Sequence, residues 1–293
     1  MTEVQLLNYD MDPDVVAFST MRQGGCSTVH KATESEACPS SNYAQFNINR
    51  YCGDSEEHVA HNRKVLCRQL GITDDRLIMP HQTHETRVAC IDERFLSLPP
   101  EERQTALEGI DALMTDVPGV CIGVSTADCI PLLLYDPQHR AACAIHAGWR
   151  GTVARIAERA VRAMTETYGT RPSDLIAQIG PGISLDSFEV GQEVYDAFAV
   201  AGFDMPTISK LYPVNNGGSQ LFTFHSSLFT SKWHLDLPEC NRRQLLASGL
   251  TAARIHLSGI CTYKACDTFF SARRLGVRSG RIFTAIVLTS SHL

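Results

Sequence analysis

Residues 120–151 read VCIGVSTADCIPLLLYDPQHRAACAIHAGWRG, the most informative segment of the chain. It contains three short apolar runs, each of strand length: Val120 to Val124, Ile130 to Tyr135 and Ala141 to Ile145. Asp136-Pro137 separates the last two runs and is a turn signal. We therefore predict that these two runs pair as a β-hairpin, and that a helix follows them.

The segments on both sides of the hairpin alternate between strand and helix patterns. Helical spacing of apolar residues predicts a first helix that starts at Asp54, with Glu57 as a capping partner, and ends before Gly71. The same spacing predicts three further helices at Thr152–Tyr168, Gly191–Phe198 and Glu239–Ala247. Further strands are predicted at Val15–Ser19, Arg87–Ile91, Ala112–Met114, Ile255–Leu257 and Ile282–Leu288. Hairpin-like strands mixed with helices favour an α+β fold over a purely parallel sheet. We expect a single layered α/β domain over residues 1–293, with mixed sheets.

Composition excludes several classes of protein. The 293 residues are 44% hydrophobic and 20% charged, which excludes a disordered or collagen-like chain. The net charge of −6 argues against a nucleic-acid partner, because such binders usually carry a basic surplus. No apolar run approaches about 18 residues, so no membrane span is expected. The N-terminus does not resemble a signal peptide, and eleven cysteines cannot all pair within the chain, so we expect a cytoplasmic protein with mostly free thiols.

The open end of the hairpin carries two side chains capable of chemistry. A turn centred between Pro137 and Gln138 would set Cys129 opposite His146. Opposed Cβ atoms of an antiparallel pair lie about 4.5–5.5 Å apart, which suits two ligands of one metal or a thiolate with its general base. A slip of one residue would put the two side chains on opposite faces. The residues alone leave both chemistries open, beside plain packing of a buried cysteine.

Two glycine turns and two histidine pairs are further candidates. His146 is followed by Gly148 and a predicted helix start, which together favour an anion pocket. Arg22 precedes Gly24 and Gly25, and its planar fork suits a phosphate or carboxylate. The remaining candidates are the histidine pairs: His58 and His61 suggest a solvated helix face, whereas His81 and His84 lie at a strand start.

Several familiar motifs are absent from the sequence. No GxGxxG follows a strand and no GxxxxGK[ST] occurs, which excludes the common dinucleotide and P-loop sites. The H-x-E…P-C-x-x-C signature of zinc nucleobase deaminases is missing. No H-x-H occurs either, although a multinuclear copper oxidase would be expected to need clustered histidines.

The motifs that are present resemble the laccase-domain proteins of the YfiH type. The family has been described first as polyphenol oxidases and later as purine nucleoside phosphorylases. The resemblance covers nearly the whole chain and rests on these segments: Arg22–Ser27, Phe46–Ile48, Gly53-Asp54, Asn62-Arg63, Gln82–His84, Asp111–Leu113, Thr126–Cys129 with Pro131, His146–Gly151, Gly180–Ile183, Phe188–Val190, Leu235–Leu237 and Phe270–Arg274. Two positions depart from the family pattern: Glu85 stands where glycine is usual, and Ser187 where a cysteine is usual.

The resemblance implies a metal site. It carries the family's His, Cys and His ligands over to His84, Cys129 and His146, and it selects His84 rather than His81. Three protein ligands with an open fourth position form the pattern of catalytic zinc. We therefore expect Zn2+; copper is possible, but not as an oxidase centre.

The resemblance also suggests roles for neighbouring residues. Asp128 would shuttle a proton or orient the ligands. Arg22 is the candidate for phosphate, Arg150 is a second candidate, and Asn47 would contact the ribose or the base.

The implied activity is that of a zinc-dependent purine nucleoside enzyme. It would cleave adenosine, inosine and methylthioadenosine with phosphate, and it would deaminate adenosine through water activated at the metal. Its partners would be a purine nucleoside and phosphate, with no nucleic acid and no membrane. The alternative is a peptidoglycan-editing hydrolase that removes L-serine from a UDP-muramoyl precursor. Two other interpretations remain open: a Cys129 thiolate nucleophile with His146 as base, and a structural metal or partner-binding module. The sequence leaves the oligomeric state undetermined.

Overall fold

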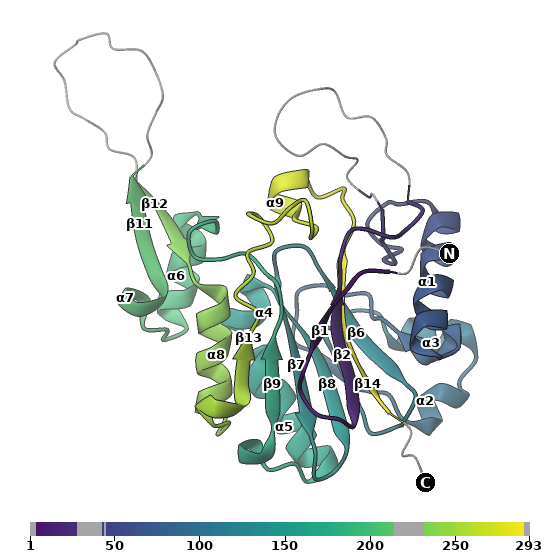
Figure 1. The fold of residues 1–293 in the computed structure, drawn as a ribbon. Helices are drawn as coiled ribbons and strands as arrows, with labels where there is room; N and C mark the ends of the chain where they lie inside the picture. Colours follow the sequence, from purple (N-terminus) through teal and green to yellow (C-terminus); the bar gives the residue numbers. More distant parts are fainter. Residues whose placement is uncertain (1–3, 28–42, 44, 214–230, 290–293) are drawn as a thin grey trace, which may run out of the picture.

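The computed structural model describes residues 4–27, 43, 45–213 and 231–289 (Figure 1). The polar composition of the stretch from Ser27 to Asn42 predicts a long loop, and this stretch lies outside the described residues except for Ser27 itself. The helices are α1 (Glu56–Leu70), α2 (Glu93–Ser97), α3 (Pro100–Ala106), α4 (Trp149–Val153), α5 (Ile156–Tyr168), α6 (Gln192–Val200), α7 (Met205–Ile208), α8 (Leu237–Ala247) and α9 (Ala272–Leu275). The strands are β1 (Leu6–Tyr9), β2 (Val15–Thr20), β3 (Leu77–Ile78), β4 (Val88–Cys90), β5 (Ala112–Thr115), β6 (Cys121–Thr126), β7 (Ile130–Asp136), β8 (Ala141–Ala147), β9 (Ile176–Ile179), β10 (Glu189–Val190), β11 (Ser209–Pro213), β12 (Ser231–Leu235), β13 (Ile255–Leu257) and β14 (Ile282–Leu288).

The described strands form three sheets. The six-stranded sheet has the order β13-β9-β7-β8-β5-β4; its outer pairs β13/β9 and β4/β5 are parallel and its inner pairs are antiparallel. The five-stranded sheet has the order β1-β2-β14-β6-β3, in which β3/β6 is the parallel pair. A three-stranded antiparallel sheet, β10-β12-β11, lies to one side of the other two with α6 and α7 (Figure 1). This confirms the α+β class with mixed sheets.

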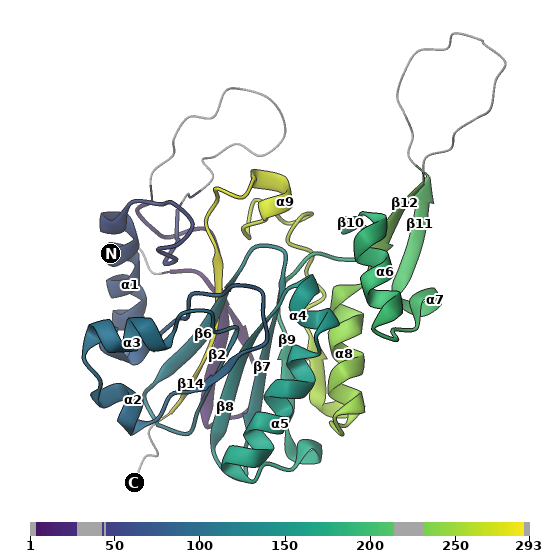
Figure 2. The same ribbon diagram turned by 180° about the vertical axis from the view of Figure 1, so that it is seen from behind.

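The two larger sheets pack face to face and are covered by helices on their outer sides. Strand β7 shows why its sequence is apolar throughout: Leu132 and Leu134 pack with α5 and α8, whereas Leu133 and Tyr135 pack against the five-stranded sheet. On the far side, Leu66 of α1 packs against that sheet. Figure 2 shows α5 and α8 over the six-stranded sheet and α1 at the opposite side. The result is four layers, helix–sheet–sheet–helix.

The hairpin is confirmed, but its predicted register is wrong. His146 pairs with Pro131, so the turn is centred one residue later than expected and Cys129 lies just before β7. Asp136 explains the shift, because its Oδ1 accepts from the backbone N–H groups of Gln138 and His139 and closes the turn there. The residue opposite His146 is thus Pro131 instead of Cys129, a shift of two positions. Because side chains alternate between the two faces of a strand, a shift of two keeps Cys129 and His146 on the same face.

Two predicted helix details are corrected. The cap of α1 is Ser55 rather than the Asp54–Glu57 pair, because the Asp54 carboxylate accepts instead from Ser27 and Asn47. The C-terminal Gly71 is confirmed, with a left-handed φ of 67°. The predicted Thr152–Tyr168 helix is interrupted between α4 and α5, where Arg155 adopts a left-handed φ of 63°.

The described part of the chain contains no helix that combines the length and the apolar character needed to cross a membrane. Ten cysteines are described, and all ten are free thiols. These ten free thiols agree with the expectation that most of the cysteines are unpaired.

Candidate metal centre

Three side chains from separate segments converge at one end of the sheets. His84 lies in the loop after β3, Cys129 precedes β7, and His146 belongs to β8. Their potential ligand atoms all lie within 4.8 Å of one another. Tetrahedral zinc with ordinary bond lengths separates two ligand atoms by about 3.3–3.6 Å, so small side-chain movements would close the set around one ion. Burial falls from His146 through Cys129 to the exposed His84, which leaves one side open to solvent.

A buried carboxylate holds two of these ligands in place. Asp111 Oδ1 lies 2.7 Å from His146 Nδ1 and also accepts from the backbone N–H of His84 at 3.1 Å. Its Oδ2 accepts from the backbone N–H groups of Thr83 and Glu85, so the carboxylate fixes the backbone on both sides of His84. With Nδ1 committed to Asp111, the Nε2 atom of His146 is the one left to bind a metal.

The backbone around the ligands is shaped for this convergence. His84 has a φ of 65° and Asp128 a φ of 94°, a left-handed region that non-glycine residues rarely occupy. At Gly148, an added Cβ would lie 2.9 Å from His84 Cδ2 and 3.2 Å from Cys129 Sγ. Only glycine leaves room there for both ligands.

Asp128 fixes the segment that carries Cys129. Its Oδ1 accepts from Thr262 Oγ1 and its Oδ2 from the backbone N–H of Arg273, both at 2.7 Å. Both carboxylate oxygens are thus committed to neighbouring segments. Of the two roles expected for Asp128, this geometry favours orientation over proton transfer.

The ligands influence one another electrostatically. Burial opposes ionisation of Cys129, but the neighbouring His146 and His84 rings lower the pKa of its thiol to about 6. Burial likewise opposes charge on His146, but Cys129 and Asp111 raise the pKa of the ring. For Asp111, hydrogen bonds from His146 and the backbone outweigh burial and lower the pKa of the carboxyl. The metal-free protein therefore contains a thiolate ready to receive a cation.

This electrostatic arrangement predicts how Cys129 reacts. In metal-free protein, iodoacetamide should alkylate Cys129 with a rate that is half-maximal near pH 6, because the thiolate already predominates at pH 7. Burial raises the pKa of the Cys121, Cys143 and Cys240 thiols, so these should stay unmodified at that pH. Peptide mass spectrometry would locate the label.

Zinc provides the control for this experiment. Added zinc should protect Cys129, since a bound thiolate is not free to react. A rate that keeps rising to pH 9 would contradict the lowered pKa, and alkylation that zinc does not block would favour the thiolate as a nucleophile.

The three ligands open into a pocket of about 520 Å³. Two arginines, Arg273 and Arg281, give its wall positive charge, and two aromatic residues, Tyr51 and Trp149, add flat surface. The remaining lining residues are Asn49, Cys52, His81, Gln82, Ser125, Thr126, Ala127, Ala272 and Val277. The pocket thus joins a candidate metal centre to cationic and aromatic groups.

Three residues expected at the substrate are not part of this lining. Arg22 is 2% exposed, donates to the Cys266 carbonyl and lies over the Phe270 ring. Arg150 is exposed and lies over the ring of Trp149. Asn47 is fully buried. Their predicted contacts with phosphate and nucleoside remain predictions, and the geometry gives Arg22 and Asn47 packing roles.

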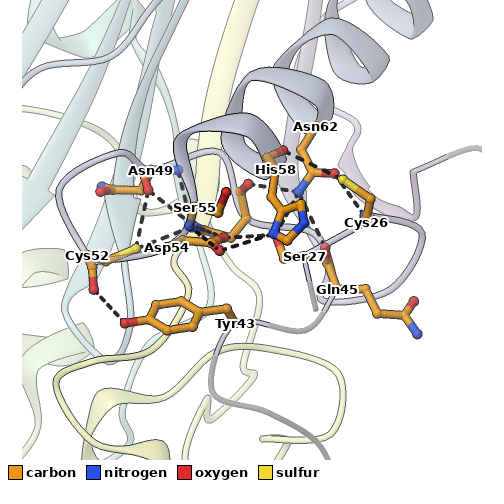
Figure 3. Close-up of polar contacts among 11 residues, drawn as sticks. Cys26, Ser27, Tyr43, Gln45, Asn49, Cys52, Asp54, Ser55, His58 and Asn62 are labelled. Atoms are coloured by element: carbon orange, nitrogen blue, oxygen red, sulfur yellow. Dashed lines mark hydrogen bonds and ion pairs between the residues drawn. The ribbon is translucent and has the colours of Figure 1, made fainter. Parts of the chain in front are cut away.

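Asn47 belongs to a buried polar network that supports the pocket wall; Figure 3 labels its partners Asn49 and Asp54. The Asn47 amide nitrogen donates to Asp54 and to the Asn49 carbonyl, and its Oδ1 accepts from the backbone N–H of Arg281. Asp54 also accepts from Ser27. One network therefore ties the Asn49–Cys52 segment to the C-terminal segment that carries Arg281.

Sequence reasoning missed several residues of the site. The motif at Asp111–Leu113 assigns no role to Asp111, although a carboxylate among the apolar residues Ile110, Ala112 and Leu113 is a signal in itself. Gln82 bonds both the N–H and the carbonyl of Ser125 and fixes the loop to β6. No local pattern distinguishes Gln82, Arg273 or Arg281 from ordinary polar residues of a protein surface.

Known proteins resemble this chain along most of its length. A family model described as "Multi-copper polyphenol oxidoreductase laccase" matches residues 16–289. The chain is 45% identical over 271 residues to a purine nucleoside phosphorylase of Bacteroides thetaiotaomicron, covering 92% of this chain and 90% of that protein. It is 44% identical over 244 residues to "Adenosine deaminase RL5" of an unknown prokaryotic organism, covering 83% and 87%.

A solved structure has a similar fold. The crystal structure of the Bacillus licheniformis hypothetical protein YfiH superposes with a TM-score of 0.76 at 26% identity, covering 94% of this chain and 93% of that one. The YfiH-like arrangement of mixed sheets is therefore confirmed.

Proposed function

The chain belongs to the multi-copper polyphenol oxidoreductase laccase family, and we propose that it is a zinc-dependent purine nucleoside enzyme. It would cleave adenosine, inosine and methylthioadenosine with phosphate, and it would deaminate adenosine. The relatives named purine nucleoside phosphorylase and adenosine deaminase support this proposal. The observation that carries it is the convergence of His84, Cys129 and His146 in one pocket with two arginines. We place the enzyme in the cytoplasm and treat residues 1–293 as one catalytic domain.

The donor set fits zinc. Two imidazole nitrogens and one thiolate are zinc ligands, and the Asp111 carboxylate behind His146 is the partner such a ligand usually has. When bound, the ion would supply Lewis-acid chemistry by lowering the pKa of water or polarising a substrate atom. The chain's own contribution is orientation: Asp111 holds the two histidines, and Asp128 holds Arg273.

Phosphorolysis needs an anion held beside the nucleoside. A phosphate oxygen forms a bond to ribose C1′ while the C1′–N9 bond breaks, and the leaving base keeps the electron pair and takes up a proton. Arg273 and Arg281 are placed for the phosphate better than Arg22, because both line the pocket. Neither makes an ion pair in the described part of the chain; Arg273 donates to the Glu189 carbonyl and Arg281 to those of Val277 and Gly280.

Deamination uses water rather than phosphate. Water adds at purine C6, the C6–N bond breaks, and ammonia leaves, so adenosine becomes inosine. The two reactions therefore give different products from adenosine: phosphorolysis gives adenine and deamination gives inosine.

Product chromatography tests the proposal. Zinc-loaded protein should convert adenosine to adenine only when phosphate is present, and to inosine with or without it. If neither product forms, the proposed function is wrong, and the alternative hydrolase is tested by supplying the serine-containing UDP-muramoyl precursor and measuring released serine.

The same assay tests the phosphate site. Arg273→Leu should raise the KM for phosphate by at least about 10-fold, because it removes a charge-assisted contact, and should leave phosphate-independent deamination nearly unchanged. Arg274→Leu is the matched control, since this neighbouring arginine contacts Tyr263 and does not line the pocket. Equal phosphate KM values in wild type and Arg273→Leu would remove Arg273 from the anion site.

A further inference from the structure

An aromatic ring stands exposed at the mouth of the metal pocket. Tyr51 is 39% exposed and Val277 is 78% exposed, and both line the pocket that holds His84, Cys129 and His146. Few large apolar side chains are this exposed in the described part of the chain. Two of them at one pocket mouth, beside a metal centre, mark a surface suited to an apolar, flat part of a ligand.

The Tyr51 ring packs against the ring of His81, which lines the same pocket. The two rings are stacked, with centroids 4.0 Å apart and planes 23° from parallel. His81 Nδ1 lies 2.7 Å from Glu108 Oε1, and the His81 backbone bonds Leu107 and Gly109 on both sides. His81 is thus fixed at its ring and at its backbone. One face of Tyr51 is covered by this stack.

The Tyr51 backbone is held as well. Its N–H donates to Asn49 Oδ1 at 2.7 Å, and the Asn49 N–H donates to Asn47 Oδ1. Asn47 is anchored by Asp54 in the buried network of Figure 3, where Asn49 and Asp54 are labelled. The ring is therefore preorganised, and a ligand would not have to order it.

We propose that Tyr51, backed by His81, is the stacking surface for the heteroaromatic base of the substrate. This inference rests on the proposed function and assigns its base-binding residue. A base on Tyr51 lies in the same pocket as the metal ligands and the two arginines, so the sugar is placed between the base and the phosphate. His81, which the metal site does not use, acquires a role as a positioning residue.

Stacking also explains a tolerance for different bases. Every purine presents a flat π-face, and stacking of a base on an aromatic ring tolerates different ring substituents. Adenine and hypoxanthine differ at C6 but share that face. An aromatic platform therefore suits an enzyme that accepts adenosine, inosine and methylthioadenosine.

Equilibrium binding tests the inference without turnover. Calorimetry with the zinc-loaded protein would measure the Kd of adenine and of hypoxanthine. Tyr51→Leu should raise both values by about 10-fold or more, whereas Tyr51→Phe should keep them within about 3-fold, because phenylalanine preserves the ring. Zinc content should be the same in all three proteins.

Two further variants complete the experiment. Tyr195→Leu is the matched control, since Tyr195 forms an equivalent stack on Trp233, 4.1 Å apart and 24° from parallel, outside the pocket lining; it should leave both Kd values unchanged. His81→Ala should weaken base binding while retaining zinc, which separates its role from that of a metal ligand.

The possible failures are distinguishable. If wild type binds purine bases and Tyr51→Leu binds them equally well, the stacking surface is wrong while the proposed function stands. If the zinc-loaded wild type binds no purine base, the proposed function fails, and this inference fails with it.

Discussion

Replacing His84 by alanine should empty the metal site and abolish phosphorolysis and deamination together. The variant leaves only Cys129 and His146, and two protein ligands hold zinc far more weakly than three. Loss of a Lewis acid that contributes several kcal/mol predicts a fall in kcat/KM on the order of 10³-fold for both reactions. The fold should survive, because His84 is exposed. Metal analysis after dialysis and product chromatography are the measurements.

Other histidines control for the loss of one imidazole. His61→Ala changes an exposed residue of α1 and should keep both zinc and activity. His81→Ala should keep zinc, which separates the two histidines of the Pro80–His84 segment. Full activity in metal-free His84→Ala protein would contradict the metal assignment, whereas loss of only one of the two reactions would mean that they do not share the centre.

Replacing Asp111 by asparagine should weaken metal binding at the same centre, because Asp111 supports the histidine ligands. The substitution removes the charge that faces His146 Nδ1 and three backbone N–H groups. Loss of such a supporting carboxylate typically weakens metal binding by about 10–100-fold. Breaking a buried charge pair also costs about 3 kcal/mol of folding free energy. Zinc titration against a competing chelator and urea unfolding would measure the two effects.

Asp136→Asn is the matched control for stability. Asp136 is also fully buried and lies 2.8 Å from a histidine, His139, at the opposite end of the same hairpin. The Asp136→Asn variant should lower the free energy of unfolding without changing zinc affinity. If both variants lose zinc equally, the effect of Asp111 is general loosening of the hairpin rather than support of His146.

The effect of Asp111 should depend on pH in a defined direction. Its pKa is lowered in the folded protein, so its stabilising contribution is present above the unfolded value of about 3.9 and is lost as the pH falls through the folded value. The stability difference between wild type and Asp111→Asn should therefore shrink as the pH falls below about 4. A difference that grows on acidification would contradict the direction of the shift.

The strands around the hairpin were predictable because their burial leaves a strong pattern. β7 and β8 are buried on both faces, so almost every residue is apolar and the run is visible in the sequence. The edge strand β11 was not predicted, since its Lys210 and Leu211 are exposed and follow no such pattern. The hairpin register depended on one side chain, Asp136, whose capping of the turn is not implied by Asp136-Pro137 alone.

The site was predictable in part. The predicted hairpin placed Cys129 near His146. Only the resemblance to a family supplied His84, because the position of His84 depends on a left-handed bend held by Asp111. Arg22 looked available beside two glycines, yet it contacts Cys266 and Phe270, which lie more than 200 residues away in sequence. Contacts of that range leave no local signal.

The pocket is built from two kinds of segment, the sheet strands and the segments that connect them. This division affects how such enzymes can diversify. Cys129 and His146 lie on or beside the central strands with Asp111, whereas Tyr51, Arg273 and Arg281 come from segments that connect or follow the sheets. Substitutions in those outer segments can change which molecule is recognised without disturbing the reactive centre. The architecture is therefore evolvable, and a mutant library restricted to residues 49–52 and 272–281 would search new substrates while keeping the proposed metal ligands intact.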